Sequence, residues 1–102
     1  MPRIEQLEKL LAADPEDSFL NFAMGMELLK AGRIEEAQAR FRGVVARDPG
    51  YVAAHAQLAK ALIAAGRTDQ ARSALAAGIE AARRTGDAHA AQEMEQDLRL
   101  LG

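Results

Sequence analysis

The chain of 102 residues contains no cysteine and no tryptophan, and aromatic residues make up only 4% of it. The absence of cysteine excludes disulfides, thiolate metal sites and a cysteine nucleophile. No apolar run approaches the roughly 20 residues that a membrane-spanning helix needs. The first residues also lack the apolar segment of a secretory signal, so we expect a cytoplasmic protein without a membrane partner.

The chain also lacks a large excess of positive or negative charge, because 13 basic and 15 acidic residues leave a formal net charge of -2. This balance gives no overall attraction to nucleic acid or to anionic membranes. The chain has no glycine-rich phosphate loop, and its serines, Ser18 and Ser73, have no histidine nearby in sequence. A nucleophile needs an oriented base, so we expect neither enzymatic activity nor a cofactor.

What the chain does have is a repeat of 34 residues. Asp14-Pro15 recurs as Asp48-Pro49. Five further residues recur at the same interval: Leu28, Ala31, Gly32, Arg33 and Ala37 return as Leu62, Ala65, Gly66, Arg67 and Ala71. A fixed period of this length indicates stacked copies of one supersecondary unit.

The units are expected to be helical, because good helix formers dominate and no window alternates as a half-buried strand would. Gly32, Gly66 and Gly86 each follow an apolar-periodic run, where a left-handed residue can end a helix. The residue before proline leaves the α region, so each Asp-Pro pair ends another helix. The expected helices span 3–13, 17–31, 34–47, 51–65, 68–84 and 87–101.

Helix ends and buried faces follow from residue type and spacing. Asp17, Thr68 and Asp87 are predicted to cap the helices that they precede or begin. Helical spacing predicts buried stripes made of Ile4, Leu7, Leu10 and Leu11; Met24, Leu28 and Ala31; Ala71, Leu75 and Ile79; and Ala91, Met94, Leu98 and Leu101.

The pattern resembles the tetratricopeptide repeat, whose signature runs W-x2-L-G-x2-Y, then A-x3-F, then P. The first unit reads Asn21-x2-Met24-Gly25-x2-Leu28, then Ala37-x3-Phe41, then Pro49. The second reads His55-x2-Leu58-Ala59-x2-Leu62, then Ala71-x3-Leu75, with Arg83 in the place of proline. Small residues such as Gly25 and Ala59 are expected where two helices cross, and His55 is expected to be a partly buried, hydrogen-bonded imidazole.

The resemblance implies an all-α fold in which antiparallel helix-turn-helix repeats stack as a short right-handed α-solenoid of about six helices. We expect a single domain, 1–102. Its parts are a half-repeat helix at 3–13, one repeat at 17–49, a second at 51–84, and a capping helix at 87–101 that fits the signature only after a shift of about two residues.

The same resemblance implies a protein-interaction module that holds a peptide or protein segment in a concave groove. On this basis the groove residues are Phe19, Phe22, Met26 and Leu29 from the first repeat, and Ala53, Ala56, Lys60 and Ile63 from the second. The competing interpretation is that a terminal helix covers the apolar set, Phe19 more than Phe22. The competing function is a self-associating building block, a homodimer that uses the same apolar surface.

Three other groups of residues have more than one interpretation. A clamp for a C-terminal carboxylate would need lysine and asparagine where Phe22, Met26 and Gln57 stand, and only Lys60 offers a groove cation, which argues against a clamp. Arg33, Arg40 and Arg47 lie seven apart and could form a phosphate-binding stripe, but a solvated face with pairs such as Glu36–Arg40 is favoured. His89, Glu93 and Asp97 could hold a metal, but the water-facing side of a helix explains their spacing, and no metal site is expected.

Overall fold

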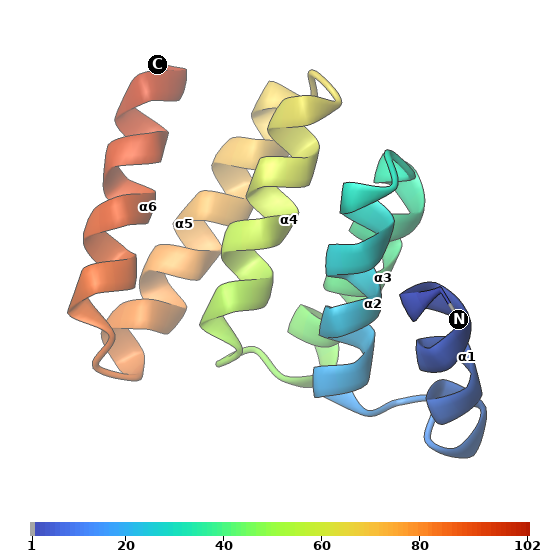
Figure 1. Cartoon of the computed structure of the whole chain (residues 1–102). Helices are drawn as coiled ribbons and strands as arrows, with labels where there is room; N and C mark the ends of the chain where they lie inside the picture. Colours follow the sequence, from blue (N-terminus) through green and yellow to red (C-terminus); the bar gives the residue numbers. More distant parts are fainter. Residues whose placement is uncertain (1) are drawn as a thin grey trace.

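The computed structural model describes residues 2–102, so Met1, the first residue of the expected domain, lies outside the described residues. Six helices follow one another through short turns (Figure 1). They are α1 (Arg3–Ala13), α2 (Ser18–Lys30), α3 (Ile34–Arg47), α4 (Val52–Ala64), α5 (Thr68–Arg84) and α6 (Ala88–Leu101). Every bound lies within one residue of the expected one, and the all-α fold is confirmed. No helix within residues 2–102 has both the length and the apolarity to cross a bilayer.

The turns have the conformation that their residues predict. Gly32, Gly66 and Gly86 adopt φ values of 78°, 73° and 80°, a region that costs glycine little. Asp17 Oδ1 accepts a hydrogen bond from the Leu20 amide at 2.8 Å, and Asp87 Oδ1 accepts one from Ala90 at 3.1 Å. The prediction for Thr68 is wrong. Thr68 is already helical, because the preceding residue takes the non-helical cap conformation, and no side chain caps α5.

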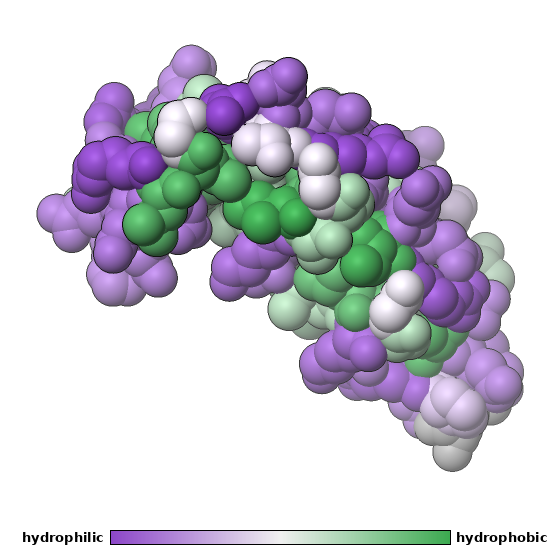
Figure 2. Space-filling view, turned by 90° about the horizontal axis from the view of Figure 1, so that it is seen from above, coloured by the Kyte–Doolittle hydropathy of each residue, from purple (hydrophilic) through white to green (hydrophobic). Residues whose placement is uncertain are grey.

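Successive helices pack as pairs, α2 with α3 and α4 with α5, while α6 packs on α5 and α1 on α2 (Figure 1). In Figure 1, α2, α4 and α6 lie in front of α3 and α5. Seen along the helices, the stack curves into a crescent with one hollow side (Figure 2).

The core runs continuously between the two layers of helices. Its largest fully buried side chains are Phe41, Met24, Leu62, Leu75 and Val44. Gly25 is buried directly against Phe41, because a Cβ added at Gly25 would lie 2.5 Å from a carbon of that ring. Ala37, Ala59 and Ala71 are also buried, so small residues stand at the helix crossings as predicted.

Two residues of the predicted stripes are not in the core. Leu10 is 54% exposed, whereas Val44, which occupies the same position one repeat later, is fully buried beside its paired helix. Leu10 is exposed because α1 has no paired helix among residues 2–102. Ala31 is exposed because it already belongs to the turn that ends α2.

Candidate functional site

The hollow side of the crescent is formed by α2, α4 and α6, and we call it the concave face. The expected groove residues differ widely in exposure. Phe19 is 64% and Ile63 41% exposed, and Lys60 is exposed as well. Four others are half-buried: Phe22, Met26, Leu29 and Ala56. Ala53 is also exposed, and the two large apolar residues of this set that are exposed, Phe19 and Ile63, lie on neighbouring helices, α2 and α4.

Phe22 is anchored between helices. Its ring centroid lies 5.8 Å from that of Phe41 in α3 and 5.2 Å from that of Tyr51, just before α4. Burial raises the pKa of the Tyr51 phenol, and the charges of Asp48 and Asp17 raise it further. This aromatic cluster joins the first helix pair to the second.

The expectation that Phe19 is the more covered of the two phenylalanines is wrong. α1 reaches α2 through Leu7 and Leu11, and through an ion pair in which Arg3 Nε lies 4.0 Å from Glu27 Oε2. This contact leaves Phe19 outside. The aromatic partners of Phe22 are Phe41 from α3 and Tyr51 from just before α4, so neither comes from a terminal helix.

A hollow of about 200 Å³ separates α4 from α6 on the concave side. Its lining comes from both helices: Ala53, Ala56, Gln57 and Lys60 from α4, and Ala90, Glu93, Met94 and Asp97 from α6. Three predicted groove residues thus line one hollow with α6. Glu93 and Asp97 form an acidic wall there, at the other end of the concave face from Phe19.

Glu93 and Asp97 are not among the expected groove residues, because the sequence of 87–101 predicts a capping helix. The sequence does contain a pattern that places them there, if the last repeat is counted as 36 residues long instead of 34. Met94 takes the place of Leu58, and Leu98 that of Leu62, 36 residues later instead of 34. Ala91 and Met94 are the buried residues of α6, as this shifted register requires.

The two polar residues in the first position of the signature, Asn21 and His55, each contact a backbone carbonyl in the turn before their helix. Asn21 Nδ2 donates to the Pro15 carbonyl at 3.0 Å, and His55 Nε2 lies 2.8 Å from the Pro49 carbonyl. A carbonyl only accepts, so His55 carries its proton on Nε2. The expectation of a partly buried, hydrogen-bonded His55 is confirmed, and the role of both residues is structural.

The arginine face and the last helix carry ion pairs. Arg33 donates two hydrogen bonds to Glu36, at 2.7 and 2.8 Å, which raise the pKa of Arg33 and lower that of Glu36. The expected Glu36–Arg40 pair is not formed, because Arg40 donates instead to Asn21 Oδ1 at 2.8 Å.

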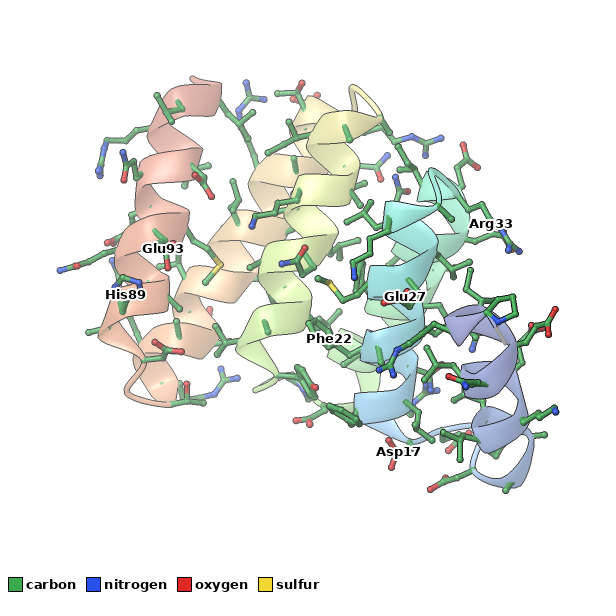
Figure 3. The ribbon with its side chains drawn as sticks, in the orientation of Figure 1. Asp17, Phe22, Glu27, Arg33, His89 and Glu93 are labelled. Atoms are coloured by element: carbon green, nitrogen blue, oxygen red, sulfur yellow. The ribbon has the colours of Figure 1, made fainter. Side chains whose placement is uncertain are left out.

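On α6, His89 Nε2 lies 2.9 Å from Glu93 Oε1, and the two side chains stand together at the surface (Figure 3). Both are largely exposed, so this pair adds little stability. In the part of the chain that the structure describes, no three histidine or carboxylate side chains are grouped closely enough to hold a metal ion.

Comparison with known proteins agrees with this geometry. Residues 28–94 match a tetratricopeptide repeat family. The TPR repeat-containing protein PA0015 of Pseudomonas aeruginosa is 40% identical over 98 residues, which are 96% of this chain and 93% of that protein. The solution structure of protein BPP2914 from Bordetella parapertussis is similar with a TM-score of 0.85 at 30% identity, over 99% of this chain and 88% of that one.

A more distant structure has the same arrangement of helices. The TPR2B domain of yeast Sti1, solved as a complex with pHsp70, has a TM-score of 0.89 at 22% identity, over 96% of this chain and 78% of that one. At this identity the likeness concerns the fold alone. The matched residues 28–94 and the 40% identical relative show that this chain belongs to the tetratricopeptide repeat family.

Proposed function

We propose that this protein is an adaptor that binds a segment of another protein along its concave face. Tetratricopeptide repeats are protein-interaction modules, and stacked repeats create extended concave binding surfaces. The observation that carries the proposal is the exposure of Phe19 and Ile63 on neighbouring helices of that face. Phe19 begins an apolar stripe on α2 that continues through the half-buried Phe22, Met26 and Leu29 to the level of Ile63, and an extended apolar surface open to water usually marks a binding site.

The two ends of the concave face differ in chemistry, which restricts the partner. α2 offers Phe19, with Met26 half-buried further along the same helix, whereas α6 offers the carboxylates of Glu93 and Asp97. A complementary segment carries apolar side chains toward α2 and a basic side chain toward α6. The partner is not expected to be held by a carboxylate clamp, because Phe22, Met26 and Gln57 occupy the sites where such a clamp needs lysine and asparagine.

The test starts from peptides selected for binding to the intact chain from a random library. Affinity is then measured by fluorescence anisotropy for the parent, for a double variant with Phe19→Glu and Ile63→Glu, and for the matched control Leu10→Glu. All three residues are well exposed, so each substitution should change the free energy of unfolding by less than about 1 kcal/mol, which thermal melts check. Phe22 is a poor probe, because its ring packs in the aromatic cluster and a carboxylate there would lack a partner.

We expect the double variant to lose at least about tenfold in affinity, or 1.4 kcal/mol, while the control binds like the parent. Equal loss in both variants, or unchanged binding in the double variant, would contradict the proposal. The competing function, a homodimer formed through the same surface, predicts that the parent dimerises and that the double variant is monomeric in sedimentation experiments.

A further inference from the structure

The outer layer of the molecule, formed by α3 and α5, contains a groove of about 320 Å³ that the proposed function does not use. Its lining includes Val45 of α3, Ala74 and Ala77 of α5, and Leu58 and Leu62 of α4. Both leucines are buried, and α4 lies on the concave side of α3 and α5 (Figure 1), so the leucines form the floor. We call this space the outer groove. All of its lining residues belong to α3, α4 or α5, so it does not depend on either terminal helix.

Arg42 stands at the mouth of the outer groove, which no carboxylate side chain lines within residues 2–102. Its Nη2 donates to Gln70 Oε1 at 2.8 Å, which links α3 to α5, but the glutamine amide is uncharged. Both side chains are exposed, as is that of Ser73 in the same lining. A guanidinium has several N–H donors in a fixed fork, so Arg42 can bind an anion while it keeps the bond to Gln70.

Carboxylates elsewhere on α3 and α5 pair with other arginines. Arg67 Nη2 lies 3.1 Å from Glu35 Oε1, and Arg72 Nη1 lies 2.6 Å from Asp69 Oδ1. Arg42 is not a member of these pairs, so its charge is available to a partner.

The equivalent groove one repeat earlier, between α1, α2 and α3, has a different chemistry. Glu8 and Glu36 line it beside two arginines, so its charges are balanced. Arg40 of that groove recurs as Ala74 in the outer groove, which removes a long charged side chain from the lining. Glu36 recurs as Gln70, which removes a carboxylate. The outer groove is therefore more apolar than its counterpart, and its charge is positive.

We propose that the outer groove binds a segment of a partner protein in which an acidic side chain stands next to a large apolar one. The carboxylate would accept hydrogen bonds from Arg42 in the bidentate geometry that a guanidinium favours. The apolar side chain would cover Val45 and Ala77, which water now reaches. A basic segment would place like charges together at Arg42, so charge complementarity selects an acidic one.

This inference does not rest on the proposed adaptor function, because α3 and α5 lie behind the helices that form the concave face (Figure 1). It is tested by a nuclear magnetic resonance titration of the intact, isotope-labelled chain with three capped peptides. They are acetyl-Ala-Phe-Glu-Ala-amide and two matched peptides with glutamine or lysine in place of the glutamate.

We expect the glutamate peptide, at millimolar concentration, to cause saturable changes in the amide shifts of Val45, Ser73 and Ala77. The glutamine peptide should bind at least about threefold more weakly, because it lacks the charge that an exposed ion pair with Arg42 needs. The lysine peptide should bind more weakly still, because its charge has the same sign as that of Arg42.

Two variants test the role of Arg42. Arg42→Gln removes the cation, and Gln70→Glu places a carboxylate where Arg42 now meets an amide. Both positions are exposed, so the thermal melts should match that of the parent. Each variant should bind the glutamate peptide at least about threefold more weakly than the parent does, and the glutamine peptide equally well. If Arg42→Gln does not fold, Gln70→Glu still decides the question.

Two controls separate the outer groove from other surfaces. Arg47→Gln removes the same charge from an exposed residue of α3 outside the groove lining, so it should bind like the parent. The double variant with Phe19→Glu and Ile63→Glu should also bind like the parent, so this proposal and the adaptor proposal can fail separately. Shift changes that are absent or confined to the concave face would overturn the proposal. Equal affinity for the glutamate and glutamine peptides, or equal weakening by Arg47→Gln and Arg42→Gln, would overturn it as well.

Discussion

Gly25 and Gly43 lie inside the two helices of the first pair, but their surroundings differ. A Cβ added at Gly25 would lie 2.5, 2.8 and 2.9 Å from three carbons of the Phe41 ring. Phe41 is completely buried, so its ring has no free space to move into. A Cβ at Gly43 would meet only the Arg47 side chain, with Nη2 at 3.3 Å, and that flexible group can move away.

Substitution by alanine should therefore change stability in opposite directions at the two sites. Replacing a glycine inside a helix by alanine stabilises the helix by about 1 kcal/mol. Overpacking a filled core costs about 1–3 kcal/mol, and three contacts under 3.0 Å to the Phe41 ring place Gly25→Ala in the upper part of that range, at about 2–3 kcal/mol. After the helix gain is subtracted, Gly25→Ala should be destabilising by about 1–2 kcal/mol, because it forces Phe41 or α2 to shift. Gly43→Ala retains most of the gain and should be stabilising by about 0.5–1 kcal/mol.

Far-UV circular dichroism melts of the parent and the two variants test this difference. For a domain of this size, about 1 kcal/mol corresponds to about 4–8 °C in Tm. Gly25→Ala should melt about 4–16 °C below the parent, and Gly43→Ala a few degrees above it. Equal shifts of the same sign would mean that only helix propensity matters, and the close contact between Gly25 and Phe41 would be refuted.

Three further predictions concern other parts of the molecule. Deleting 87–102 removes α6 and uncovers Ile79. The remaining chain should stay helical by circular dichroism but should aggregate, as light scattering would detect. A stable monomer would contradict the role of α6 in covering the apolar side of α5. His55→Asn should nearly preserve stability, because asparagine can reach the Pro49 carbonyl as Asn21 reaches the Pro15 carbonyl. His55→Leu should cost about 1–3 kcal/mol of stability, because it leaves the Pro49 carbonyl unpaired. Equal midpoints of urea unfolding for the two variants would refute this. Tyr51 is the single tyrosine of the chain, and its pKa is raised above 10.0, so an ultraviolet absorbance titration should show its midpoint above that value in the folded chain. The folded state holds this proton more tightly, so the resulting stability is present below pH 10 and is lost as pH rises through the raised pKa; a folded-state midpoint at or below 10.0 would contradict the burial of Tyr51.

Local residue chemistry and the 34-residue period were enough to predict the helices and the small residues at their crossings. Glycine in the left-handed region and proline after aspartate act within one turn, so they place helix ends without knowledge of the tertiary structure. Gly25 could be assigned to a crossing because its position recurs as Ala59, and the buried Phe41 ring confirms it.

The exposure of individual groove residues could not be predicted, because it depends on which neighbouring helix covers them. Phe19 and Phe22 lie one turn apart, but Tyr51 from the next pair covers only Phe22. Glu93 was assigned to solvent because the two-residue shift of α6 hides its equivalence with Gln57. The exposure of Leu10 depends on the absence of a paired helix for α1 within the described residues, which is not a property of the leucine itself.

The central claim, that a protein segment binds along the concave face, is tested most directly by a nuclear magnetic resonance titration. Isotope-labelled chain is mixed with a library-selected peptide, and the amide shift changes are mapped onto the structure. We predict changes concentrated on the concave residues of α2 and α4, from Phe19 to Leu29 and from Ala53 to Ile63, and extending to Glu93 for a peptide with a basic end. Changes confined to α3 and α5, with α2 and α4 unaffected, would contradict the claim.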